Sequence, residues 1–175
     1  MEKVVGSDRR SARLLGLRTA ILVVLGWDLL ILGYIALGVA QGVAQGRDPL
    51  DMDLVPAGQF LLAFTAVAVV AAAPGGWVLG PEAAISVGMS RKAVISAMAL
   101  GAVLIGDAVL SVGFALAPTQ GDNAFGPLSA ATVASLMVSG GVIVGPFVFA
   151  FVTLPSAAIW TSMVRRAWWR SHSSA

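Results

Sequence analysis

Long apolar stretches separated by short polar ones dominate this chain. Each stretch is longer than the roughly 20 predominantly apolar residues that a helix needs to cross the hydrocarbon core of a bilayer. Lipid offers no partner to backbone polar groups, so each stretch is expected to be a helix. The pattern predicts an all-α integral membrane bundle of about four transmembrane helices, forming one domain. The predicted spans are residues 19–41, 57–79, 93–116 and 131–155.

The two ends of the chain are polar and are predicted to be tails, residues 1–18 and 160–175. Pro74, near the end of the second span, removes a backbone hydrogen bond and predicts a kink or an early end there. The last apolar stretch, 128–159, is longer than one span requires. One kinked helix is expected, with a broken or re-entrant segment as the alternative.

Charge sets the expected orientation. Ten of the eleven Lys and Arg residues lie in the N-terminal tail, the connector 80–92 or the C-terminal tail. The C-terminal tail is predicted to lie at the membrane interface. Only Arg47 falls in a predicted outer loop. Because cytoplasmic segments are enriched in Lys and Arg, both termini and the connector are expected on the cytoplasmic side of a bacterial plasma membrane.

The composition narrows the possible chemistry. With 58% hydrophobic and 11% charged residues, the chain fits an integral membrane protein surrounded by lipid. It has no cysteine, and its single histidine, His172, lies in the tail, so no metal site or cofactor is expected. The basic residues sit at span ends, which argues against nucleic-acid binding. No nucleophile–base pair or phosphate loop is visible, so the chain is not expected to be an enzyme.

The connector between the second and third spans reads GPEAAISVGMSRK. Pro81 fits the first turn of a helix, and Glu82 suits the positive end of the helix dipole. These features predict a short cytoplasmic interfacial helix ending near Met89, followed by Ser90 as a helix N-cap. The alternative is a tight turn anchored by two basic residues.

The connector resembles an element of the permease subunits of ABC-2-type transporters, especially small actinobacterial ones. Gly88, Met89, Ser90, Arg91 and Lys92 match its Gly-x-Ser/Thr-Arg-Arg/Lys pattern. The similarity covers about residues 80–110, and the family usually has six spans where four are predicted here. The resemblance implies contact with a separate ATPase subunit. The residues expected to form this contact are Glu82, Ile85, Met89, Ser90, Arg91 and Lys92.

Two acids, Asp28 and Asp107, fall inside predicted spans. A carboxylate at the centre of a membrane helix costs about 2.5–3.5 kcal/mol, so each acid needs a partner, a wet cavity or a proton. Their depths, roughly 14 and 21 Å at about 1.5 Å per residue, are similar enough for the acids to approach one another. Asp107 and Ser111 belong to a sparse polar stripe on the third span. The acids either couple transport to protons or hydrogen-bond a neighbouring helix.

Glycines spaced four residues apart allow helices to approach closely. The first and last spans each contain such a pair, Gly38 with Gly42 and Gly141 with Gly145. These faces predict helix packing and homo- or hetero-oligomerisation. For the first pair, the alternative is a flexible exit of the chain from the membrane.

Three functions are consistent with these observations. The first is a permease-like membrane subunit of an ABC-type transporter, driven by a separate ATPase through the connector. The second is a small proton-coupled carrier that uses Asp28 and Asp107. The third is an accessory subunit that scaffolds a larger membrane complex.

Overall fold

The protein is an all-helical bundle, as the computed structural model shows for residues 2–48, 54–116 and 141–173. No strand occurs within these ranges. Four helical segments are long and apolar enough to cross a membrane, which confirms the predicted all-α class. Residues 141–148 are helical and lead into the following π-helical turn. The elements are α1 (Glu2–Ala44), α2 (Val55–Ile85), α3 (Met89–Leu116), the π turn η2 (Phe149–Thr153) and α5 (Leu154–His172).

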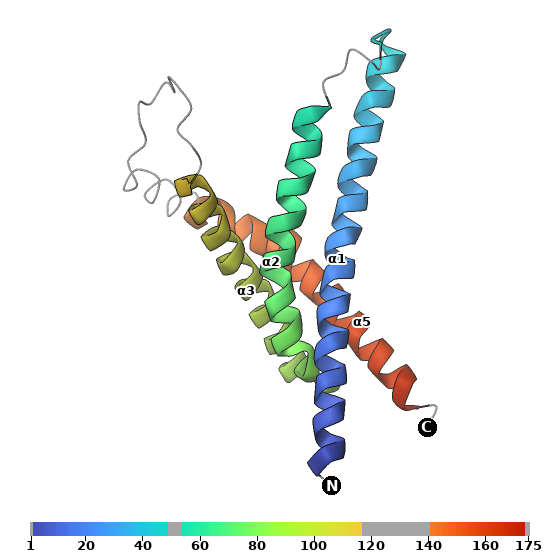
Figure 1. The fold of residues 1–175 in the computed structure, drawn as a ribbon, viewed down its shortest axis with the longest axis vertical. Helices are drawn as coiled ribbons and strands as arrows, with labels where there is room; N and C mark the ends of the chain where they lie inside the picture. Colours follow the sequence, from blue (N-terminus) through green and yellow to red (C-terminus); the bar gives the residue numbers. More distant parts are fainter. Residues whose placement is uncertain (1, 49–53, 117–140, 174–175) are drawn as a thin grey trace.

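The helices are arranged around α2 (Figure 1). α1 packs along one side of α2, α3 packs along another, and α5 crosses the bundle in contact with all three. The N-terminus, the C-terminus and the turn between α2 and α3 lie at the same end of the bundle. We call this end the terminal end.

The first and last helices extend beyond their predicted spans. α1 has 43 residues and is therefore about 65 Å long, roughly twice the thickness of a hydrocarbon core. Its first turns, expected as a polar tail, continue the membrane helix. α5 likewise continues to His172. Trp160, expected at the membrane interface, is instead 1% exposed, because α5 crosses α1 there and buries the indole.

α2 continues through two prolines. Pro74 and Pro81 both lie inside the helix, which ends at Ile85, so the early end expected at Pro74 is not found. The separate interfacial helix expected over the connector is not found either, since residues 81–85 form the last turn of α2. Ala83 and Ala84, directly after Pro81 and Glu82, are buried in the core. The chain then reverses at Gly88, whose φ of 63° is readily adopted only by glycine.

A π-helical turn precedes the last proline. Residues 149–153 form this turn, and the Leu154 N–H bonds the Phe149 carbonyl five residues back. Pro155 follows directly and has no N–H to continue an α-helical ladder. Such wider turns are a common way to accommodate local strain in a helix. The described part of the last stretch is thus helical from Gly141 to His172, while residues 128–140 lie outside the described residues.

Small residues bring α1 and α2 into backbone contact. Gly16 on α1 faces Gly76 and Gly80 on α2, and a Cβ built on Gly16 would overlap the Gly76 carbonyl oxygen. A Cβ on Gly80 would lie 2.5 Å from the Ala12 carbonyl oxygen, and one on Gly76 would lie 2.8 Å from the Ala20 Cβ. Ala12, Gly16 and Ala20 repeat every four residues, as do Gly76 and Gly80. We call this contact the small-residue seam.

The core lies toward the terminal end. Apolar side chains on the other half of the helices, such as Leu29, Tyr34 and Leu62, are largely exposed. A lipid bilayer is the environment that suits such a surface. The buried core residues include Ala12, Ala20, Ala83, Ala84, Val94, Met98, Ala99, Ala157, Trp160 and Val164.

Candidate functional site

A cavity of about 790 Å³ lies between the four helical segments. Its walls are almost entirely apolar and come from all four segments, for example Val24, Val67, Val103 and Val148. On the side of the terminal end, the cavity borders the core. Four residues belong to both, namely Ala20, Met98, Ala157 and Trp160. A volume of this size is in the usual range for small-molecule sites.

Few polar groups line this cavity. The Trp27 indole N–H donates a hydrogen bond to the Ser156 hydroxyl at 2.8 Å, and this bond joins α1 to α5. The Ser156 hydroxyl in turn donates to the Val152 carbonyl at 2.6 Å. Asp107 is the only ionisable residue among the described residues that line the cavity. An apolar space with a few placed polar groups is typical of a ligand site.

The two membrane acids have different surroundings. Asp28 is buried, at 8% exposure, and accepts a hydrogen bond from the Thr65 hydroxyl of α2 at 2.9 Å. This arrangement fits the structural alternative, in which an acid bonds a neighbouring helix. Asp107 is exposed, and its carboxylate oxygens lie 3.4 Å from the position of a Cβ on Gly141. The Ser111 hydroxyl donates to the Asp107 backbone carbonyl at 2.8 Å, not to the carboxylate.

The four glycines predicted to pack helices occupy different places. Gly42 is buried, and Gly141 and Gly145 both line the cavity. Gly38 is exposed, and a Cβ built on it would meet no atom within 4 Å in the described part of the chain. Their role in helix contacts or oligomerisation stays a prediction. The seam that the structure does contain was not anticipated.

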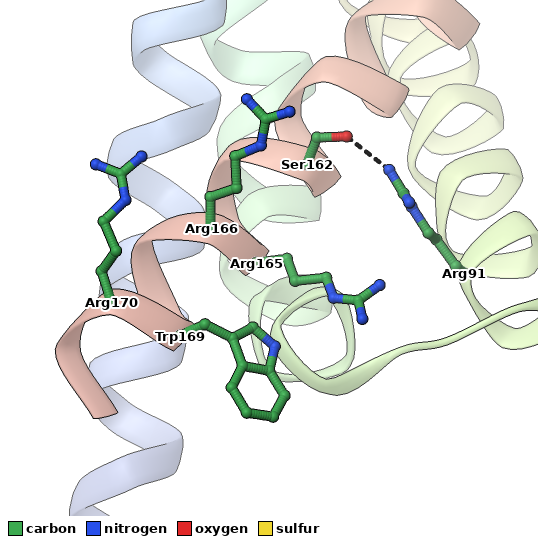
Figure 2. Close-up of a pocket in the computed structure, with 6 residues that line it drawn as sticks. All are labelled: Arg91, Ser162, Arg165, Arg166, Trp169 and Arg170. Atoms are coloured by element: carbon green, nitrogen blue, oxygen red, sulfur yellow. Dashed lines mark hydrogen bonds between the residues drawn. The ribbon is translucent and has the colours of Figure 1, made fainter. Parts of the chain in front are cut away.

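The connector residues divide into an exposed set and an inward-facing set. Arg91 turns inward, and its guanidinium donates a hydrogen bond to the Ser162 hydroxyl of α5 at 2.6 Å (Figure 2). Ser86 is also buried. The exposed residues are Glu82, Ile85, Val87, Gly88, Met89, Ser90 and Lys92.

No family model, curated protein or solved structure matches this chain. Its class therefore rests on the fold and the surface. Four long apolar helices with a lipid-compatible exterior are those of a multi-pass membrane protein.

Proposed function

We propose that this protein is a permease-like membrane subunit of an ABC-type transporter, with ATP hydrolysis supplied by a separate subunit that contacts the α2–α3 turn. One observation carries the proposal: the two helices that the turn joins also form walls of the cavity. Ala71 of α2 and Met98 of α3 both line it. A displacement of the turn would therefore move the cavity walls.

The surface of the turn supports contact with a partner. Ile85 and Met89 are 64% and 87% exposed at the terminal end of the bundle. Glu82 and Lys92 flank these apolar side chains and are exposed as well. An apolar centre with a charged rim is the usual composition of a protein–protein interface.

The turn is also connected to the rest of the bundle. Ala83 and Ala84, just before it, are buried in the core, and Arg91, just after it, bonds Ser162 on α5. A force applied at the turn would therefore reach three helices. Packed and hydrogen-bonded contacts of this kind can carry movement from one site to another.

The test of this proposal is co-purification with an ATPase and substrate-stimulated ATP hydrolysis. We expect Glu82→Lys to abolish most of the stimulated hydrolysis, because it reverses the charge on the partner-facing rim. The charge lies near the end of α2 and should change the stability of the fold by no more than about 1 kcal/mol. Asp8→Lys is the matched control, since Asp8 is an exposed acid near the same end of the bundle. If no ATPase co-purifies with the wild-type protein, or if Glu82→Lys retains substrate-stimulated ATP hydrolysis, the accessory-subunit function replaces this proposal.

A proton-coupled carrier is the second candidate, because Asp107 is the sole ionisable group on the described cavity wall. Under the permease proposal we expect Asp107→Asn to fold and to retain most transport, since asparagine keeps the size and polarity of the side chain. Transport by reconstituted protein across a range of pH provides the measurement. Asp28→Asn is the control, because Asp28 bonds Thr65 and does not line the cavity. Loss of pH-dependent transport in Asp107→Asn alone would establish the carrier instead.

A further inference from the structure

A second, strongly basic pocket lies where α5 passes the start of α3 (Figure 2). Its volume is about 490 Å³. On α5, the pocket residue Ser162 lies between the core residues Trp160 and Val164. We call it the arginine pocket. The described residues that line it are Arg91, Ser162, Arg165, Arg166, Trp169 and Arg170.

Two arginines approach the gap between α3 and α5 from opposite sides. Arg91 reaches from α3 to Ser162, and Arg165 extends from α5 toward α3 (Figure 2). The Arg91 Nε atom is buried and has no hydrogen-bond partner in the described structure. A buried, unpaired donor on a charged group is costly, and the described structure gives this guanidinium no anionic partner.

Within residues 8–48, 54–113 and 141–173, no carboxylate neutralises Arg91, Arg165 or Arg166. Arg91 donates its hydrogen bond to a neutral serine, and neither Arg165 nor Arg166 forms an ion pair in these ranges. Like charges that share one pocket repel one another unless an anion lies between them. The arrangement thus favours a bound anion over an internal salt bridge.

The hydrogen-bonding geometry of arginine and the position of the pocket indicate which chemical group that anion carries. Guanidinium groups bind phosphate through two parallel hydrogen bonds, which lysine does not provide. Trp169 at the rim is 58% exposed, as expected for an aromatic side chain at a membrane interface. Basic pockets between membrane helices on the cytoplasmic side bind anionic lipid headgroups. We propose that the arginine pocket binds a phosphate group at the membrane surface, with Arg91 and Arg165 as its principal ligands.

The proposal is tested on the full-length protein, delipidated in detergent and titrated with phosphatidylglycerol, phosphatidylcholine or inorganic phosphate. Binding is counted by native mass spectrometry, with thermal stability as a second readout. We expect phosphatidylglycerol to bind more tightly than phosphatidylcholine. Arg165→Gln should weaken that binding about fivefold, the usual effect of one basic residue at a membrane surface. Raising the ionic strength should weaken it further.

Arg10→Gln is the matched control, because Arg10 is exposed on α1 near the same end and lies outside the pocket. Arg166→Gln provides a second variant that leaves the Arg91–Ser162 bond intact. If millimolar inorganic phosphate alone stabilises wild type and not Arg165→Gln, the phosphate comes from solution and the site stands. The proposal is overturned if neither ligand distinguishes wild type from Arg165→Gln, or if Arg10→Gln weakens binding equally. These measurements need no ATPase, so they stand apart from the transporter proposal.

Discussion

Gly80→Val is expected to separate α1 from α2 and to leave little folded protein. A Cβ at this position would lie 2.5 Å from the Ala12 carbonyl oxygen and 3.2 Å from the Arg13 Cα. Both are backbone atoms, so no side-chain rotation can relieve the overlap. Overpacking of a tight contact costs about 1–3 kcal/mol, and we expect the upper end here because a helix has to move. Lipid supplies little hydrophobic force to keep the displaced helices together.

The matched control is Gly101→Val on α3. A Cβ built there meets no atom within 4 Å among the described residues, so the same change of residue type should have little effect through packing. The surviving monodisperse protein is measured by size-exclusion chromatography after heating in detergent. Equal stability of the two variants would show that the small-residue seam does not hold α1 against α2.

The helical type of the apolar segments follows from the sequence with little ambiguity. Uninterrupted apolar runs in lipid have to satisfy their backbone groups internally, and only a helix does so within one segment. The small-residue seam follows the same rule that selected Gly38 and Gly42, namely that small residues four apart allow helices to approach closely. Gly16, however, falls in a stretch that its arginines marked as a polar tail. The length of α1 beyond the hydrocarbon was therefore not anticipated.

Predictions made from the residue type and its neighbours in the sequence were wrong where tertiary packing overrides those preferences. Pro81 ordinarily marks the start of a helix, yet it continues α2, because the turns around it are buried against α1. Trp160 begins the basic, aromatic C-terminal segment and resembles an interfacial anchor, yet the crossing of α5 over α1 buries it. Both outcomes depend on contacts with helices that are distant in the sequence, so the residues adjacent to Pro81 and Trp160 do not predict them.

For the candidate sites, too, some features were predicted from the sequence and others are visible only in the structure. The sequence identified Asp28 and Asp107 as unusual, because ionisable groups in lipid are costly. It did not show that one bonds Thr65 while the other lines a cavity. That difference depends on which way each helix is rotated about its axis. Arg91 was likewise selected as a partner contact, and its bond to Ser162 depends on the path of α5.

Trp160→Ala is expected to destabilise the bundle by about 3–5 kcal/mol, the usual cost of removing a buried tryptophan. Trp160 is 1% exposed, and its indole N–H donates to the Gly16 carbonyl oxygen at 2.8 Å. Gly16 also contacts Gly76 and Gly80, so this one side chain attaches α5 to the small-residue seam. The substitution would leave a void between the core and the cavity. Trp160→Phe, which fills most of the space, should lose only about 1 kcal/mol for the hydrogen bond.

A second readout separates this attachment from simple loss of volume. Because Ser162 lies on α5 two residues after Trp160, a displaced α5 would also move Ser162 away from Arg91. Phosphatidylglycerol binding should therefore fall in Trp160→Ala and persist in Trp160→Phe, although Trp160 does not line the arginine pocket. Trp77→Ala, at a partly exposed tryptophan of α2, controls for the loss of an indole. If Trp160→Ala loses thermal stability but keeps its phosphatidylglycerol binding, other contacts position α5, and the tryptophan only fills space.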